Sequence, residues 1–184
     1  EELAIRLAGI TGRTCPSFPQ KSVVLFAADH DITLKGVSAT GQEVTEIQVR
    51  NFLKGGGTIN AFCRNAGASL TVVDVGIKGD VGGAEGLVLY SPAQVDAEVL
   101  PAAEMLWRTQ TPHTYKLGEL CQAHEEAKKG VTLLSAGGMG IGNTSPSSAV
   151  AAVLTGAPVE GVTGIGSGIP SERVRHKAEL IRQG

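Results

Sequence analysis

Cysteine is scarce in this chain, and its cysteines lie far apart. Cys15, Cys63 and Cys121 are odd in number and include no C-x-x-C pair. The sequence therefore suggests neither a disulfide framework nor a zinc site, and we expect no metal. A reduced, cytoplasmic compartment is the simplest interpretation of this cysteine usage.

Long apolar runs and an excess of one charge are also lacking. No apolar run approaches the roughly 18 residues that a membrane-spanning helix requires, and the start does not resemble a signal peptide. The formal net charge is −2, and the basic residues are scattered. Without a global attraction to nucleic acid or to an anionic membrane, we expect neither as a partner. The chain begins at Glu1 inside a helical pattern, which we interpret as a trimmed or processed end.

Glycine, in contrast, is abundant. The chain holds 25 glycines in 184 residues, close to twice the usual share of about 7%. The excess falls mainly between apolar runs, which suggests binding sites lined by backbone. The length suits one domain, which would bury roughly 70% of its unfolded surface. We expect residues 1–184 to form a single α/β nucleotide-binding domain.

Apolar runs of strand length alternate with helical patterns. We predict strands at residues 22–28 and 69–76, because both runs are nearly all apolar, as in parallel strands buried on both faces. Helical spacing over residues 37–53 and 58–66 separates them, and residues 1–10 are also predicted to be helical. This order is a crossover unit, so the predicted fold is a three-layer, Rossmann-like α/β domain with a mainly parallel sheet.

The middle of the chain is less regular. Residues 78–91 are rich in glycine and include a short apolar run at residues 87–90. Ser91-Pro92 could open a helix. Residues 117–129 are predicted to form another helix, which Gly130 ends.

Residues 131–149 form the unit around which the prediction is organised. Residues 131–134 are predicted as a short strand, and four glycines follow within six positions: Gly137, Gly138, Gly140 and Gly142. Asn143 and Thr144 are N-cap residue types, and a small apolar helix comes next. The free N–H groups and the positive dipole end of this helix favour an anion. The alternative is a glycine-rich turn that only lets the helix pack closely.

The same order of strand, glycine loop and helix recurs at the end of the chain. We predict a short strand at residues 161–165, with a loop that contains Gly164, Gly166 and Gly168. Ser171 is predicted to cap the last helix, which carries Lys177. Two glycine loops at one sheet edge would form a continuous cradle, and Lys177 would add a cation for a phosphate. The alternative for Lys177 is a solvated helix face.

Polar residues follow the first predicted strand. Residues 22–28 lead directly into Asp29, His30 and Asp31. In open α/β sheets, ligands bind outside the carboxyl ends of the strands, so Asp29 and His30 are candidates for a polar site. The alternative is a turn in which Asp29 accepts loop N–H groups.

A dinucleotide fingerprint is not matched. G-x-G-x-x-G is absent, because residues 138–142 follow G-x-G-x-G. The acidic residue near the required offset, Glu160, does not end a convincing second strand. A nicotinamide dehydrogenase is therefore disfavoured, and we expect no cofactor.

Several short motifs in a fixed order resemble one family. They are LAGI, FAADHDI, GVSATGQEVT, NFLKGGGTINAF, AGASLTVVDVGI, GMGIGNTSPSSA, LTG and VTGIGSGIP. Over most of the chain they resemble nicotinate-nucleotide:dimethylbenzimidazole phosphoribosyltransferases, which build the lower-ligand nucleotide of cobalamin. The resemblance implies transfer of phosphoribose from nicotinate mononucleotide to a benzimidazole-type base such as 5,6-dimethylbenzimidazole. Nicotinate would leave and α-ribazole 5′-phosphate would form. It also implies a homodimer.

The resemblance assigns site residues as well. It implies that Thr40 and Gln48 recognise the base. It places the phosphate cradle at a set drawn from both glycine loops and the last helix: Gly140, Gly142, Asn143, Thr144, Gly166, Gly168 and Lys177. This set agrees with the anion site that the glycine loops predict on their own.

Two departures from the family bear on catalysis. The family places a glutamate at the position of Gly138. Its proton-accepting glutamate lies in a later Glu-Gly-rich segment, and this chain ends at Gly184 before such a segment. We therefore interpret the chain as an incomplete version of the enzyme and assign no catalytic residue; Asp29, Asp31 and Glu43 are candidate replacements by location only. The alternative hypothesis is a non-catalytic module that holds a nucleotide or a benzimidazole and requires a partner chain.

Overall fold

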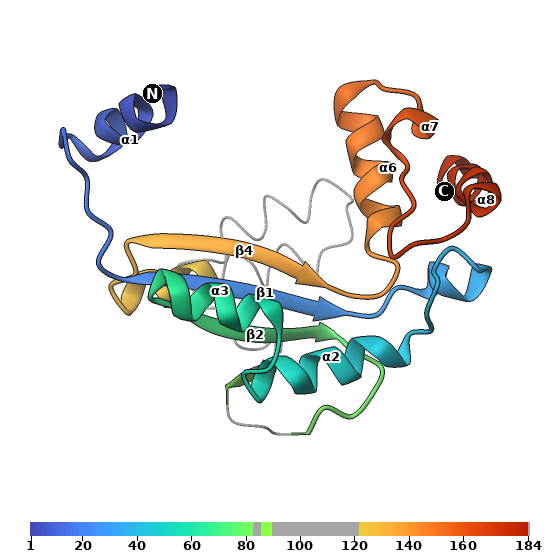
Figure 1. Cartoon of the computed structure of the whole chain (residues 1–184), viewed down its shortest axis with the longest axis horizontal. Coiled ribbons are helices and arrows are strands. Elements are labelled where there is room, and N and C mark those ends of the chain that lie inside the picture. The colour runs from blue at the N-terminus through green and yellow to red at the C-terminus, as the bar shows by residue number, and fades with distance from the viewer. Residues whose placement is uncertain (83–85, 90–121, 184) are drawn as a thin grey trace.

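The computed structural model describes residues 1–82, 86–89 and 122–183 (Figure 1). These residues build a four-stranded sheet in the order β3-β2-β1-β4, in which every neighbouring pair is parallel. The strands are β1 (Lys21–Ala28), β2 (Ala68–Gly76), β3 (Leu87–Leu89) and β4 (Leu133–Met139). The predicted α/β fold with a mainly parallel sheet is confirmed.

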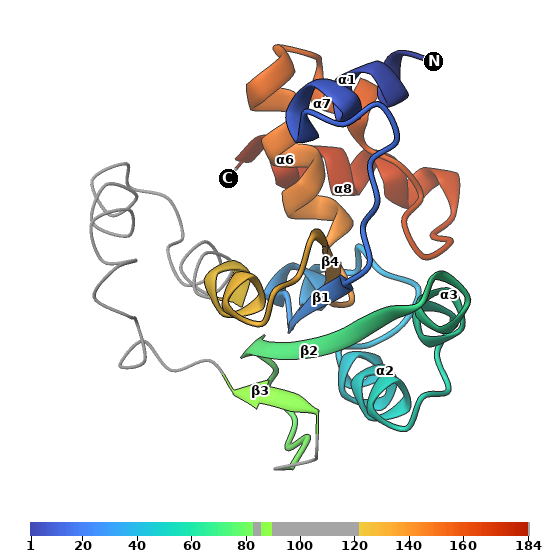
Figure 2. The same cartoon turned by 90° about the vertical axis from the view of Figure 1, so that its left-hand side faces the viewer.

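Both faces of the sheet are covered by apolar packing. On one face, Leu25 and Ala27 of β1 pack with Val49 and Val72 beneath α2 (Glu43–Leu53) and α3 (Thr58–Ala66). On the other face, Val24, Phe26 and Val73 form a second cluster. Figure 2 shows α2 and α3 together on one side of β1 and β2. Burial on both faces explains why β1 reads as a nearly continuous apolar run.

The remaining helices lie outside this packed unit. They are α1 (Glu2–Thr11), the 3₁₀ helix η1 (Asp31–Lys35), the helical residues 122–128, α6 (Thr144–Thr155), α7 (Val159–Val162) and α8 (Ser171–Gln183). Figure 1 shows α6, α7 and α8 gathered beyond the carboxyl end of β4. α8 buries Ala178 and Ile181, and Ser148 Oγ of α6 donates to the carbonyl oxygen of Val162 at 2.8 Å. The predicted helices at the start of the chain and at residues 58–66 are confirmed.

The predicted strand at residues 131–134 is misplaced. β4 begins at Leu133 and continues to Met139, so Gly137 and Gly138 lie inside the strand and not in the loop. Gly137 pairs with Leu25 and Gly138 with Phe26 of β1. Pairing with a neighbouring strand overrides the weak strand preference of glycine.

Three further predictions differ from the structure. Residues 161–165 do not form a strand; Pro158 precedes the short helix α7, and the amide of Gly161 donates to the Pro158 carbonyl oxygen at 2.9 Å. The helix predicted over residues 37–53 begins only at Glu43. Ahead of it, the Ser38 hydroxyl accepts from a backbone amide, a bond that competes with helix formation. Ser171 is the first residue of α8 and not its cap.

Some predictions lie partly or wholly outside the described residues. The helix predicted to open at Ser91-Pro92 falls there, whereas the described part of the 117–129 prediction is helical. That residues 1–184 form a single domain stays a prediction. Within the described ranges, no helix combines the length and the hydropathy that crossing a bilayer would take.

Candidate functional site

The carboxyl edge of the sheet brings two predicted site segments together. β1 leads into Asp29 and His30, and β4 leads into Gly140. The two strands are parallel neighbours, with Ala27 opposite Met139. The loops that follow therefore leave the sheet side by side, at the edge where α/β proteins bind ligands.

The first glycine loop, residues 140–143, is packed tightly against the end of β1. A methyl group on Gly140 would collide with the carbonyl oxygen of Ala28 and would lie 2.9 Å from the His30 ring. Gly142 has φ +91°, and a methyl group there would lie 2.6 Å from Cγ2 of Thr33. Both positions therefore require glycine, Gly140 for space and Gly142 for space and conformation.

Several amides of this loop are already hydrogen bonded within the protein. Ile141 N donates to Oγ1 of the fully buried Thr45 at 3.1 Å, which ties the loop to α2. The amides of Asn143 and Ser145 donate to loop carbonyl oxygens at 3.1 and 3.0 Å. Asn143 occupies the N-cap position of α6, but its side chain makes no capping hydrogen bond. A ligand would therefore meet that side chain or the amide at the first residue of α6 rather than the occupied amides.

Lys177 of α8 joins the two glycine loops. Its Nζ donates to Thr144 Oγ1 at 2.7 Å, at the start of α6, and to the carbonyl oxygen of Gly164 at 3.2 Å. The lysine is fully buried, and burial lowers its pKa. Among the described residues, no carboxylate pairs with it. The site therefore holds a buried ammonium group whose present partners are neutral oxygens.

The second glycine loop, residues 164–168, closes over this ammonium group. A methyl group on Gly166 would lie 2.9 Å from Thr144 Oγ1 and 3.4 Å from Lys177 Nζ. Gly166 and Gly168 have φ of +55° and +102°, whereas a methyl group on Gly168 would touch nothing within 4 Å. The Gly168 amide donates to the Ile165 carbonyl oxygen at 3.1 Å. Thr144, which follows the first loop, and Lys177 thus bring the two loops together, and their role as one phosphate cradle stays a prediction.

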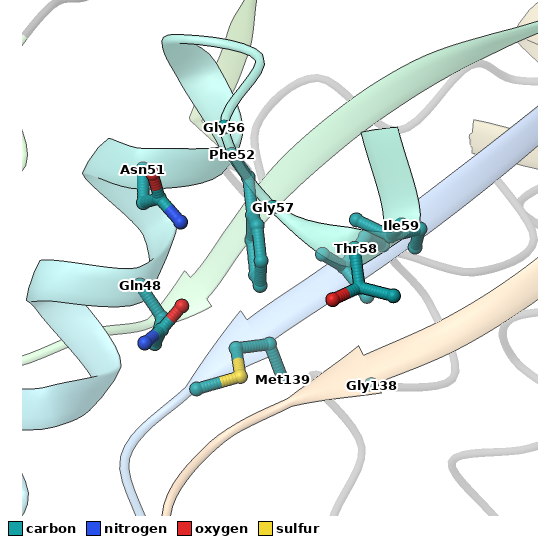
Figure 3. A pocket seen from close by; sticks show the side chains of 10 residues that line it. Gln48, Asn51, Phe52, Gly56, Gly57, Thr58, Ile59, Gly138 and Met139 are labelled. Carbon is teal, nitrogen blue, oxygen red and sulfur yellow. The ribbon is translucent and has the colours of Figure 1, made fainter. Parts of the chain in front are cut away.

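The two predicted base-binding residues lie in different surroundings. Gln48 of α2 lines a cavity of about 400 Å³, and Figure 3 shows Phe52 projecting between Gln48 and Thr58 toward Met139. Thr40 is exposed in the loop before α2 and is not among the residues that line this cavity. The full lining consists of Leu25, Gln48, Asn51, Phe52, Gly56, Gly57, Thr58, Ile59, Gly138 and Met139.

Asp29 and His30 lie beneath the first glycine loop. His30 Nε2 and Asp29 Oδ1 are buried and have no hydrogen-bond partner among the described residues. Asp29 Oδ2 accepts the amide of Lys78 at 2.8 Å, in agreement with the turn interpretation of this residue. Burial lowers the pKa of His30, while the charge of Asp29 acts in the opposite direction. Neutral imidazole is therefore the favoured form at this position.

The other candidate carboxylates have separate surroundings. Asp31 forms an ion pair with Lys78, and hydrogen bonds from Lys78 and Gln42 lower the pKa of Asp31. Glu43 is exposed at the first turn of α2. In the part of the chain that the structure describes, no group of three His, Cys, Asp or Glu side chains is arranged to hold a metal ion.

The sequence alone did not identify several residues that shape the site. Thr45 anchors the first loop, and Phe52 and Met139 form apolar walls of the cavity. The signal for Thr45 was its position four residues before Val49, on the buried face of α2. No sequence pattern pointed to the cavity walls, because they come from separate elements.

Comparisons with known proteins identify the family of this chain. A family model described as Phosphoribosyltransferase matches residues 1–184. The nicotinate-nucleotide–dimethylbenzimidazole phosphoribosyltransferases of Roseiflexus castenholzii and Chloroflexus aggregans are 40% identical over 185 residues and 42% identical over 183 residues. Both alignments cover all of this chain and 51% of the relative. The chain thus spans about half the length of the curated relatives it matches.

Solved structures lead to the same family. The crystal structure of a nicotinate-nucleotide-dimethylbenzimidazole phosphoribosyltransferase from Thermus thermophilus superposes with a TM-score of 0.77 at 36% identity, covering 100% of this chain and 53% of that one. A second structure, CobT from the same organism, gives 0.75 at 34% identity over 99% of this chain and 54% of that one. From the full-length family match, the sequence identity and the shared fold, we conclude that the chain belongs to this family of phosphoribosyltransferases.

Proposed function

We propose that this chain is the nucleotide-binding part of an enzyme that transfers phosphoribose from nicotinate mononucleotide to 5,6-dimethylbenzimidazole or a related base. The product would be α-ribazole 5′-phosphate, for cobalamin biosynthesis. The observation that carries the proposal is the buried Lys177, held between two glycine loops and bonded, among the residues that the structure describes, only to neutral oxygens.

A phosphate suits this site on energetic grounds. Removing an ammonium group from water costs several kcal/mol even after the protein relaxes, and a hydroxyl and a carbonyl oxygen offset only part of that cost. A phosphate dianion bound against the two glycine loops, within reach of Lys177, would supply the missing opposite charge. The N-terminal end of α6 begins at Thr144, and its dipole adds to the attraction. The remaining proton of the ammonium group is a further donor.

An aromatic base suits the neighbouring cavity. Gln48 supplies an amide that can both donate and accept hydrogen bonds at the edge of a heterocycle. Phe52 and Met139 offer an aromatic and a thioether surface for its faces. We assign Thr40 to the same base, from the loop ahead of α2. The cavity thus combines apolar surfaces with polar side chains, and small-molecule sites use the two for contact area and for orientation.

The chemistry asks mainly for positioning. Departure of nicotinate leaves positive charge at the anomeric carbon, and the attacking azole loses its N–H proton as the new bond forms. Holding both substrates in line therefore supplies much of the rate enhancement, and a proton acceptor supplies the rest. We assign no residue of this chain as that acceptor, since the family resemblance places it in a later segment. Asp31 is held by Lys78 and is a poor replacement.

The proposal also covers the domain organisation, the location and the oligomeric state of the protein. We propose that residues 1–184 form one domain, that the protein acts in the cytoplasm, and that two copies form a homodimer. No cofactor and no nucleic acid enter this account. Nicotinate mononucleotide and a benzimidazole-type base are the proposed partners.

Calorimetric titration of nicotinate mononucleotide into the 184-residue chain tests the cradle. In Lys177→Met, the apolar stem is kept and the charged donor is lost, so affinity should fall by about tenfold or more, because charged hydrogen bonds are worth about 1.5–3 kcal/mol. The matched control is Lys54→Met, an exposed lysine after α2, whose affinity should equal that of the wild type. Equal affinities for all three proteins would remove Lys177 from the site.

The second candidate function is a non-catalytic module that needs a partner chain. Glycine at position 138, where the family has a glutamate, is the observation that favours it. Incubation with nicotinate mononucleotide and 5,6-dimethylbenzimidazole should then give no α-ribazole 5′-phosphate, and a chain that supplies the later segment should restore product. Turnover by the 184-residue chain alone would refute our placement of the proton acceptor outside it.

A further inference from the structure

A short bridge of hydrogen bonds joins the two proposed subsites. Ser167, between Gly166 and Gly168, lies with its Oγ 3.3 Å from Ser38 Oγ and accepts the amide of Ala39 at 3.4 Å. Ser38 Oγ in turn accepts the amide of Thr40 at 3.3 Å. The proposed base-binding threonine is therefore two hydrogen bonds away from the second glycine loop.

The loop that carries Thr40 is held at both ends by elements of the same site. Before it, His176 Nε2 of α8 hydrogen bonds to the carbonyl oxygen of Lys35 at 2.9 Å. After it, Gln42 Nε2 donates to the carbonyl oxygen of His30 at 2.9 Å. Figure 1 shows the segment after β1 lying beside α8. Within the loop Val37 is buried, and the later residues are half-buried or exposed.

Helix α8 supports the bridge and the cradle at adjacent positions. His176 contacts the loop before Thr40, and the next residue, Lys177, contacts both glycine loops. A phosphate bound to Lys177 beside Gly166 would restrict the second glycine loop. Ser167 is the next residue of that loop, so the same event would restrict Ser38 and Thr40.

Because the hydrogen bonds of the bridge are weak, we expect the bridge to couple the binding of the two ligands rather than to hold the loop rigidly. The bridge is exposed, and an exposed hydrogen bond has a small net value, so the bridge alone contributes little to fixing the Thr40 loop. A first ligand that orders the loop leaves less ordering to be done by the second. That condition produces positive coupling between two ligands.

We propose that Ser167 is a positioning residue through which a phosphate in the cradle aligns Thr40 with the aromatic base. The proposal rests on the proposed function, since it needs both subsites. Its consequence is that each of the two ligands, the phosphoribosyl group and the base, binds more tightly to protein that already holds the other ligand than to empty protein. By reciprocity, each ligand raises the affinity for the other by the same factor.

Calorimetry on the 184-residue chain tests the proposal with two non-reacting probes, ribose 5-phosphate and 5,6-dimethylbenzimidazole. The affinity for the base is measured without ribose 5-phosphate and at its saturation, and the ratio is the coupling factor. We expect a factor of about two to ten in the wild type, the range that one net hydrogen bond supplies. In Ser167→Ala the factor should fall to one, while each probe alone binds within twofold of the wild-type affinity.

Four further variants make the result specific. Ser167→Thr keeps the hydroxyl and should restore the coupling factor. Ser38→Ala should remove it, and Ser38→Ala with Ser167→Ala should have no additional effect, because both substitutions break one bridge. Ser69→Ala removes an exposed serine hydroxyl at the start of β2 and should keep the wild-type factor.

The outcomes separate this proposal from the function on which it rests. An unchanged coupling factor in Ser167→Ala, or a factor of one in the wild type with both probes bound, overturns the bridge and leaves the proposed function intact. Absence of binding of either probe to the wild type overturns both.

Discussion

The two glycine loops differ in the physical reason why they require glycine. In the first loop, Gly140 and Gly142 are packed against β1 and η1, where an added methyl group would collide or lie 2.6 Å from a neighbour. In the second loop, a methyl group on Gly164 or Gly168 would meet nothing within 4 Å. Gly166 is the exception in the second loop, because a methyl group there would lie 2.9 Å from Thr144 Oγ1. The first loop is therefore set mainly by packing, and the second mainly by backbone conformation.

This difference suggests a division of labour at the site. The first loop is anchored to α2 through Thr45, and its amides at Asn143 and Ser145 are satisfied, so it is a preformed wall. The second loop rests on Lys177 and the exposed Ser167 bridge, so it is the part that a ligand would order. A preformed wall reduces the ordering cost of binding, and an adjustable loop allows coupling between ligands.

The largest expected effect is at Gly140. Gly140→Ala should lower the free energy of unfolding by about 3 kcal/mol, because the new methyl group collides with the backbone oxygen of Ala28, which cannot move without disturbing β1. Urea unfolding followed by circular dichroism measures the change. A loss below about 0.5 kcal/mol, the level of an ordinary surface substitution, would mean that the first loop is not set by packing.

A smaller effect is expected in the second loop. Gly168→Ala should cost about 1 kcal/mol, because its φ of +102° strains a residue with a side chain even in open space. Gly164→Ala is the matched control, with open space and no positive φ, and should stay within about 0.5 kcal/mol of the wild type. Equal losses at both positions in the same urea experiment would contradict the conclusion that Gly168 is required for its backbone conformation.

A pH-dependent effect of modest size is expected beneath the first loop. Burial lowers the pKa of His30 below its ordinary value of 6.5, so the unfolded chain takes up a proton before the folded one. Stability is therefore lost as the pH falls through 6.5 toward the lower folded pKa, and it is kept above that range. His30→Gln should lose less free energy of unfolding between pH 8 and pH 5 than the wild type. The same loss in both proteins would show that His30 is not desolvated under Gly140.

Much of the fold could be predicted from the sequence because burial leaves a strong pattern. The run at residues 22–28 became β1 at Lys21–Ala28, and the helix at residues 58–66 was placed correctly. The prediction was wrong at β4, because Gly137 and Gly138 were assigned to a loop, whereas in the structure they pair with β1. Local preference is weak evidence when a neighbouring strand supplies the hydrogen bonds.

The site was predictable in its composition and not in its connections. The glycine loops and Lys177 could be named as candidates from the sequence, although the strand predicted before the second loop is absent and their role stays a prediction. The contact of Lys177 with Thr144 and the bridge from Ser38 to Ser167 join residues 33 and 129 positions apart. No periodicity in the sequence encodes such contacts, because they depend on how separate elements pack.

The central claim is that the two loops and Lys177 form one phosphate cradle, and a crystal structure of the chain with ribose 5-phosphate tests it most directly. We predict the phosphate against the two glycine loops, with an oxygen about 2.7–2.9 Å from Lys177 Nζ, the distance of a charge-assisted hydrogen bond. A phosphate bound elsewhere, with Lys177 still bonded only to Thr144 and Gly164, would contradict the account.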